Sequence, residues 1–209
     1  MSSSNEIPKD PQAKSGFSRR TLFRGAGVSG GVLSAGLLEQ EAQAQTPANV
    51  TSGEVDITLD INGKKRSVKV EPRVTLLDAL RNRLDVTGAK RVCDRGTCGA
   101  CTMMVAGKVV YSCTMLAIDA VDKPIQTIEG LAPEGQIHPI SKAFVNHDAQ
   151  QCGYCTPGFI MATKGFLDRN PNPTPEQVEK GLSGNLCRCG TYMGMKNAVL
   201  EAAKEIKNG

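Results

Sequence analysis

The eight cysteines of this 209-residue chain fall into two sets of four. The N-terminal cysteine set is spaced C-x4-C-x2-C-x11-C and consists of Cys93, Cys98, Cys101 and Cys113. The C-terminal cysteine set is spaced C-x2-C-x31-C-x-C and consists of Cys152, Cys155, Cys187 and Cys189. Four thiolates can hold one metal centre, and the first three cysteines of the N-terminal set have a spacing typical of 2Fe–2S clusters. The pattern predicts two metal centres that carry electrons.

The loops that carry the cysteines are rich in glycine. Gly96 and Gly99 lie within the N-terminal set, and Gly153 lies within the C-terminal set. Glycine lets the backbone approach a metal centre closely, so that N–H groups can hydrogen-bond to the sulfurs and set the reduction potential. Both loops therefore have the character that iron–sulfur chemistry needs.

Two other uses of the cysteines remain open. Structural zinc modules usually pair two C-x2-4-C units, whereas the N-terminal set has a three-cysteine loop plus one distant cysteine. Disulfides would be the ordinary expectation for an even cysteine count in an exported chain. However, Cys187 and Cys189 lie one residue apart, and Cys98 and Cys101 bracket only Gly99-Ala100. Both spacings are unfavourable for bridging, and iron–sulfur clusters are the preferred interpretation.

The composition excludes several classes of function. The net charge is +4, and no basic run with interleaved aromatics suggests a nucleic-acid partner. No apolar run approaches the length of a membrane span. Paired carboxylates, a nucleophile–base arrangement and a phosphate loop are all missing, so we predict no catalytic residue. His138 and His147 are interpreted as surface or helix-end residues, and five methionines (103, 104, 161, 193 and 195) as packing residues.

Residues 1–44 have the pattern of an export signal. Arg19-Arg20 precedes a mildly apolar stretch over residues 26–38, and Ala42-Gln43-Ala44 has the form of a cleavage site. The arginine pair resembles a twin-arginine signal, which predicts a periplasmic protein. This pathway carries folded cargo, so metal centres can be inserted before export. The alternative is a disordered tail with a chance arginine pair. Residues 45–53 are interpreted as a linker.

Residues 54–130 are predicted to form a small sheet packed on one helix. Apolar residues alternate over 55–61, and Asn62-Gly63 is typical of a hairpin turn before a second strand ending near Val70. A helix is expected over 75–84. Two further strands are joined at 106–108, and a closing strand covers 125–128. This is the arrangement of a plant-type ferredoxin-like domain.

Residues 131–209 are predicted to form four helices. The first runs from Pro139 to about His147, and the second from a Thr156 cap to about Asp168. The third begins with the capping box Thr174–Gln177, and the last runs from about Tyr192 to Ile206. The C-terminal set lies just before the second and fourth helices, where backbone N–H groups favour negative charge. The fold class is therefore α+β.

Four motifs give the chain a resemblance to a known family. They are Cys93-Asp94-Arg95-Gly96-Thr97-Cys98-Gly99-Ala100-Cys101-Thr102, Thr127-Ile128-Glu129-Gly130-Leu131, Gln151-Cys152-Gly153-Tyr154-Cys155-Thr156-Pro157-Gly158 and Gly184-Asn185-Leu186-Cys187-Arg188-Cys189-Gly190. Over residues 54–206 the chain resembles the small iron–sulfur subunit of the molybdenum hydroxylases, which include xanthine dehydrogenases and aldehyde oxidoreductases.

The resemblance implies a β-grasp, ferredoxin-like domain followed by a four-helix domain, with one 2Fe–2S cluster on each cysteine set. It implies a large molybdopterin subunit, which Gln151 and Cys189 would approach, and usually a medium subunit with FAD. Electrons would pass from molybdenum through the C-terminal and then the N-terminal cluster to FAD or another acceptor. The export signal favours the periplasmic aldehyde-oxidising branch. Purine or N-heterocycle oxidation and a stand-alone ferredoxin-like carrier are the alternatives.

Overall fold

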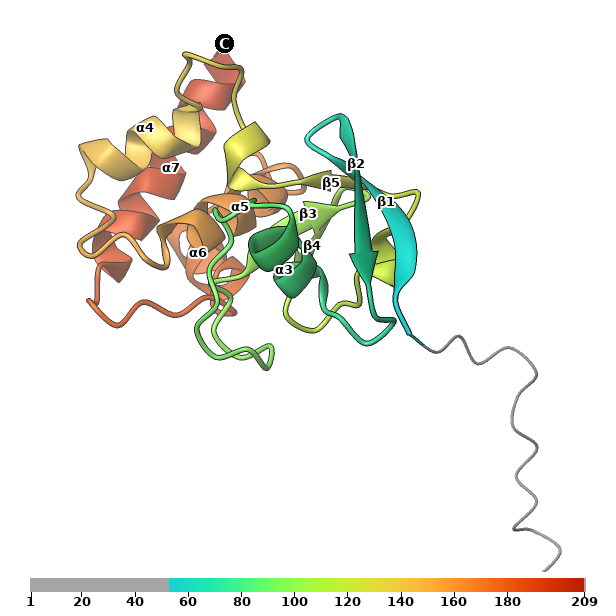
Figure 1. Ribbon diagram of the computed structural model, residues 1–209. Coiled ribbons are helices and arrows are strands. Elements are labelled where there is room, and N and C mark those ends of the chain that lie inside the picture. Colours follow the sequence, from blue (N-terminus) through green and yellow to red (C-terminus); the bar gives the residue numbers. More distant parts are fainter. Residues whose placement is uncertain (1–52, 209) are drawn as a thin grey trace, which may run out of the picture. The chain divides into compact units, whose positions relative to one another are not determined.

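The computed structural model describes residues 53–208, which combine a five-stranded sheet with a group of four helices (Figure 1). The predicted export signal and all of the predicted linker except Gly53 lie outside the described residues. The sheet precedes the helices in the chain, which confirms the α+β fold class. No helix among residues 53–208 is long and apolar enough to cross a membrane.

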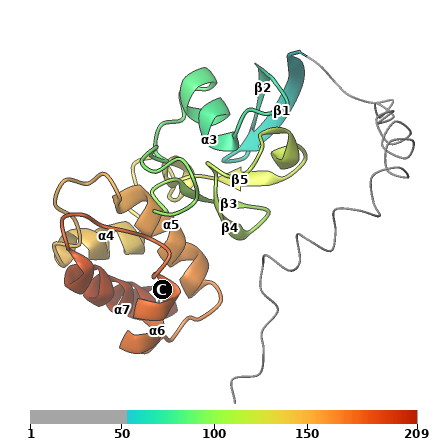
Figure 2. The same cartoon turned by 90° about the horizontal axis from the view of Figure 1, so that it is seen from below.

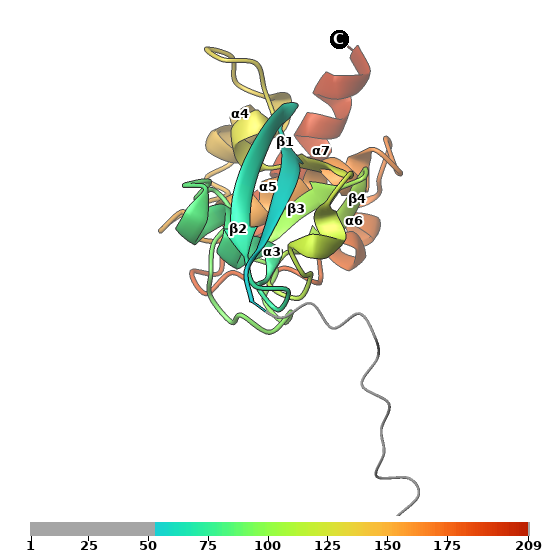
Figure 3. The same ribbon diagram turned by 45° about the vertical axis from the view of Figure 1, so that its right-hand side comes forward.

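The sheet has the order β2-β1-β5-β3-β4. Its strands are β1 (Val55–Ile61), β2 (Lys64–Val70), β3 (Thr102–Val105), β4 (Lys108–Tyr111) and β5 (Pro124–Gln126). β1 and β5 are parallel and the other neighbours are antiparallel, so the sheet is mixed. Figure 3 shows β1 and β2 side by side.

The first hairpin follows directly from its sequence. Ile57, Leu59 and Ile61 are buried while Asp56 and Thr58 are exposed, because successive side chains of a strand point to opposite faces. The turn residues Asn62 and Gly63 have φ angles of 52° and 76°. Positive φ at both positions suits the two-residue turns that match strand twist.

The helix predicted over 75–84 is only partly regular. Thr75 accepts a hydrogen bond from the Asp78 amide and starts α3 (Leu76–Asp78), after which the chain widens into a π-type segment, η1 (Ala79–Arg83). Beyond it the Val86 amide reaches back to the carbonyl of Leu80 at 2.9 Å. The pattern of apolar residues predicted the buried face but not this wider turn.

The closing strand is shorter than predicted, because the backbone of Thr127 hydrogen-bonds to a side chain and not to a neighbouring strand. β5 ends at Gln126, and the next residue, Thr127, donates its amide to Asn62 Oδ1 at 2.9 Å. The chain then forms a short 3-10 turn, η3 (Ile128–Gly130). A second 3-10 turn, η2 (Ile118–Ala120), precedes β5.

The four predicted helices are all present (Figures 1 and 2). They are α4 (Pro139–Asn146), α5 (Thr156–Leu167), α6 (Pro175–Gly181) and α7 (Tyr192–Asn208). The capping box of α6 is formed as predicted. The N-cap predicted for α5 is wrong by one residue, because Cys155 and not Thr156 is the N-cap. Thr156 is already helical, and its buried hydroxyl has no hydrogen-bond partner among the described residues.

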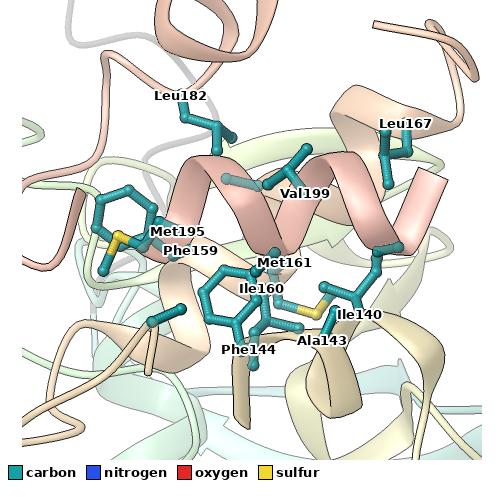
Figure 4. Packing of buried hydrophobic residues seen from close by; sticks show 14 of the residues in the cluster. Ile140, Ala143, Phe144, Phe159, Ile160, Met161, Leu167, Leu182, Met195 and Val199 are labelled. Carbon is teal, nitrogen blue, oxygen red and sulfur yellow. The ribbon is translucent and has the colours of Figure 1, made fainter. Parts of the chain in front are cut away.

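The helices share one hydrophobic core. Phe144 of α4, Phe159 of α5 and Val199 of α7 meet there (Figure 4). Four of the five methionines are buried as predicted, but Met193 is 66% exposed.

α5 also packs on the sheet. A Cβ added at Gly165 of α5 would overlap Val109 of β4, and Met104 of β3 belongs to the same core as the helices. The opposite sheet face holds a separate core that includes Leu59, Leu77 and Ile125. The sheet therefore lies between two cores, and α5 links it to the helices.

Candidate iron–sulfur sites

The N-terminal set is brought together by one loop and the end of one strand. Cys93, Cys98 and Cys101 lie in the loop before β3, and Cys113 lies two residues after β4. The Cys93 thiol lies beside that of Cys98, and the Cys113 thiol lies beside that of Cys101. The four cysteines predicted to act together are therefore neighbours in space.

Backbone amides point at the sulfurs of this set. The Gly96 amide donates to Cys113 Sγ at 3.2 Å, and the Thr97 amide donates to Cys93 Sγ at 3.4 Å. Gly96 adopts a φ of 74°, which glycine tolerates without strain and which turns the loop inward. Donors on sulfur are the groups that tune an iron–sulfur centre.

The two ends of the N-terminal set differ in acidity. Burial raises the pKa of Cys93, but hydrogen bonds from Thr97 and Arg95 outweigh burial and bring that pKa down to about 6. Burial, with the hydrogen bond to Cys101, raises the pKa of the Cys113 thiol to about 11. Metal ligation requires thiolates, so a metal must displace the proton from Cys113.

The C-terminal set lies before two helices, as predicted. Cys152 and Cys155 precede α5, and Cys187 and Cys189 precede α7. The Cys155 thiol lies beside that of Cys187, and the Cys152 thiol lies beside that of Cys189. Cys152 and Cys189 are exposed, whereas Cys187 is buried. One side of this set therefore faces outward.

The start of α7 surrounds Cys187 with polar groups. Thr191 Oγ1 lies 3.3 Å from Cys187 Sγ, and the Tyr192 hydroxyl accepts from the Cys187 amide at 2.8 Å. Burial raises the pKa of Cys187, but the hydrogen bonds from Thr191 outweigh it and lower that pKa to about 7. Burial raises the pKa of its neighbour Cys155 to about 12.

The donor sets fit 2Fe–2S groups. Each set holds two pairs of thiols, and in such a cluster each iron takes two protein ligands.

Gln151 and Cys189, which are predicted to approach molybdopterin, are both exposed at the outward side of the C-terminal set. Their contact with the pterin stays a prediction. His138 and His147 cap the two ends of α4, in agreement with the helix-end interpretation.

Sequence reasoning missed the polar residues that support the cysteines. Thr191, Tyr192 and Asn185 do not belong to a spacing pattern, and only the folded chain shows that they contact the cysteine loops. The motif Gly184–Gly190 contained Asn185, but nothing in the sequence indicated its partner.

An apolar rim adjoins the cysteines of the C-terminal set in the sequence. It consists of the exposed side chains of Tyr154, Leu186, Tyr192 and Met193. Leu186, Tyr192 and Met193 also line a cavity of about 370 Å³ whose floor includes Phe159 and Met195. Large exposed apolar side chains beside a site are typical of protein interfaces.

Two family models match the chain. Residues 59–128 match a 2Fe-2S iron-sulfur cluster binding domain, and residues 127–200 match a 2Fe-2S binding domain. The first model contains the N-terminal set and the second contains the C-terminal set.

The chain also resembles characterised proteins. The nicotine 6-hydroxylase small subunit of Paenarthrobacter nicotinovorans is 45% identical over 157 residues, covering 75% of this chain and 94% of that one. The aldehyde oxidoreductase iron-sulfur-binding subunit PaoA of Escherichia coli O157:H7 is 35% identical over 232 residues, covering 100% of both chains.

A solved structure shares the fold. The aldehyde oxidoreductase from Desulfovibrio desulfuricans ATCC 27774 is 38% identical with a TM-score of 0.70, and the match covers 73% of this chain and 17% of that one. In that protein the matching segment is therefore part of a much longer chain. Together with the two cysteine sets and the order of sheet and helices, these matches show that the chain belongs to the small iron–sulfur subunits of the molybdenum hydroxylases, which serve oxidoreductase complexes in electron transfer.

Proposed function

We propose that this chain is the electron-transfer subunit of an exported molybdenum hydroxylase that oxidises aldehydes to carboxylic acids. The observation that carries the proposal is the gathering of four thiols in each cysteine set, with backbone N–H groups directed at two sulfurs of the N-terminal set and the Thr191 hydroxyl beside Cys187. Each set would hold one 2Fe–2S cluster through its four cysteines, and each cluster would accept and pass on one electron at a time. The chain supplies the thiolates, the donors and a fixed spacing between the sets.

The substrate class rests on the relative that matches over the full length. PaoA of Escherichia coli O157:H7, the iron-sulfur-binding subunit of an aldehyde oxidoreductase, matches all of this chain, including the segment before residue 53. The nicotine 6-hydroxylase small subunit has a higher sequence identity, 45%, but its match covers only 75% of this chain. This identity makes the oxidation of an N-heterocycle the second candidate reaction.

The partner is a large molybdopterin subunit that covers the apolar rim. Gln151 and Cys189 lie at the outward side of the C-terminal set, among the rim residues, so a subunit docked there would meet the exposed half of this set. The Desulfovibrio desulfuricans protein carries the matching segment within a longer chain, which supports a permanent association. A medium FAD subunit would take electrons from the N-terminal set.

The proposed export signal in residues 1–44 would carry the complex to the periplasm. Replacing Arg19 and Arg20 by lysine should keep the positive charge but lose the arginine pair. We expect the variant to remain in the cytoplasm with its clusters assembled, which cell fractionation and a visible spectrum would reveal. Unchanged periplasmic recovery would contradict twin-arginine export.

Purification of the tagged chain from its host tests the proposed role. We expect a molybdenum-containing large subunit to co-purify, and an aldehyde to bleach the visible absorbance of the complex. Bleaching by an N-heterocycle but not by aldehydes would favour the second candidate. Isolation as a molybdenum-free monomer with intact clusters would instead indicate a stand-alone carrier.

A further inference from the structure

Three consecutive residues of the C-terminal motif reach across to the loop of the N-terminal set and to the end of β4. The Leu186 amide donates to the carbonyl of Cys98 at 2.9 Å. The Asn185 side-chain amide donates to the carbonyl of Gly99 at 2.9 Å, and Gly184 accepts a hydrogen bond from the Tyr111 hydroxyl at 2.8 Å. We call residues 184–186 the inter-set bridge.

Asn185 is the buried centre of this bridge. Its side chain is 6% exposed, and its Nδ2 donates both to Gly99 and, at 3.3 Å, to Thr102 Oγ1. A buried amide that loses its partners costs free energy, so these two acceptors hold Asn185 in one place. Because Leu186 follows directly, the position of Asn185 also fixes the Leu186 amide.

Glycines keep the two loops at backbone contact. A Cβ added at Gly158 of α5 would overlap the Gly99 carbonyl, and a Cβ added at Gly99 would lie 2.6 Å from the Asn185 side chain. No side chain separates the loops at these points. The spacing between the cysteine sets is therefore set by direct contact, and a small movement of Asn185 would change it.

The bridge joins two cysteines by a short route. Leu186 precedes Cys187 in the chain, and the carbonyl that accepts its N–H belongs to Cys98. The path from the Cys187 sulfur to the Cys98 sulfur thus consists of covalent bonds and one hydrogen bond. Cys187 and Cys98 belong to different sets, so this path connects the two candidate sites.

We propose that Asn185 is a positioning residue for electron transfer between the two sets, because it holds the Leu186 N–H against the Cys98 carbonyl. This inference rests on the proposed function. In the step concerned, one electron leaves the reduced C-terminal centre, which is oxidised, and reaches the N-terminal centre, which is reduced. No bond forms or breaks and no proton moves. The electron comes from the substrate, or from dithionite in a test.

The test compares Asn185→Leu with a matched control in the complete complex. Leucine has a similar shape but cannot donate. Asn146→Leu is the control, because Asn146 is exposed and its hydrogen bond, to Glu201 at 2.8 Å, joins α4 to α7 and involves no residue of the inter-set bridge. Rapid-freeze EPR after mixing with substrate gives the delay between reduction of the two centres, and the spectrum of the fully reduced protein gives their magnetic coupling.

We expect Asn185→Leu to show a several-fold longer delay and a changed coupling, while Asn146→Leu matches the wild type. Equal delay and equal coupling in Asn185→Leu and Asn146→Leu, with both signals present, would overturn the inference. Absence of two iron–sulfur signals in the wild type would instead overturn the proposed function, so the two failures are distinguishable.

A second variant covers the case in which Asn185→Leu loses a cluster or does not fold. Tyr111→Phe keeps the ring and removes only the hydrogen bond to Gly184. We expect a smaller change of delay in the same direction. If Asn185→Leu cannot be isolated with both centres, an unchanged delay and coupling in Tyr111→Phe would overturn the inference.

Discussion

At the scale of single residues, the grouping of the cysteines into two sets was predictable and their supporting groups were not. Close spacings such as C-x4-C-x2-C are typical of iron–sulfur ligands and are visible in the sequence. The donors around them depend on how distant segments approach. The Gly96 amide reaches Cys113 across 17 residues, and Asn185 reaches Gly99 across 86.

The ligand assignment predicts the outcome of single cysteine substitutions. Cys113→Ser should remove the signal of the N-terminal centre, and Cys187→Ser should remove that of the C-terminal centre, because each replaces one of four ligands. EPR spectroscopy of the reduced variants gives the signals that remain. Retention of both signals, unshifted, in either variant would refute the assignment.

The Thr191 hydroxyl should tune the C-terminal centre. A hydrogen bond to sulfur stabilises the more negative, reduced state, so Thr191→Val should lower the reduction potential of this centre. A hydrogen bond worth about 1 kcal/mol corresponds to roughly 40 mV for one electron. An EPR-monitored redox titration measures the change.

Thr58→Val is the matched control for this titration, since Thr58 is exposed on β1 and its hydroxyl contacts Ser67. An equal potential shift in both variants, or none in Thr191→Val, would contradict this role of Thr191.

At the scale of elements, periodicity predicted the strands and helices, and side chains altered their ends. β5 is shorter than expected because Asn62 pairs with Thr127, and α5 is capped at Cys155 and not at Thr156. Neither effect is visible in a local pattern. The alternation of β1 and the capping box of α6 are local, and both were predicted correctly.

The cap of α4 should make stability depend on pH. His138 Nδ1 accepts from the Ile140 amide at 3.2 Å, which requires an unprotonated nitrogen. Burial lowers the pKa of His138, helped by the charge of Lys164 and opposed by that of Asp168. Folding therefore favours the neutral form, so this contribution is complete above the unfolded pKa of about 6.5 and is lost as pH falls below it.

Thermal unfolding at pH 7.5 and pH 5.5 tests this dependence. We expect His138→Asn, which can cap without titrating, to lose less stability on acidification than the wild type. An identical decrease in both proteins would show that His138 does not cause it.

The contact between α5 and β4 predicts a compensating pair of substitutions. A Cβ at Gly165 would overlap Val109, so Gly165→Ala should destabilise the protein by about 1–3 kcal/mol through overpacking. Val109→Ala removes the atoms in the way, and the double variant should recover part of the loss. Denaturant unfolding of the four proteins measures the coupling, and strictly additive effects would contradict the contact.

At the scale of the whole molecule, the sheet and the helices act as one support for both cysteine sets. We propose that the chain has two domains, residues 54–130 and residues 131–209, and that each domain carries one cysteine set. In the described part of the chain, α5 and the inter-set bridge nevertheless join them closely. Sequence patterns predicted two modules, but the contacts between them involve glycines and one buried asparagine whose partners no periodicity reveals.

The central claim is that the chain carries two distinct 2Fe–2S centres on one electron path. Iron and acid-labile sulfide analysis, combined with EPR of the dithionite-reduced complex, tests it most directly. We predict about four irons and about four sulfides per chain, with two distinguishable signals that interact magnetically. A colourless protein that contains zinc and no labile sulfide, or one with a single iron–sulfur signal, would contradict the account.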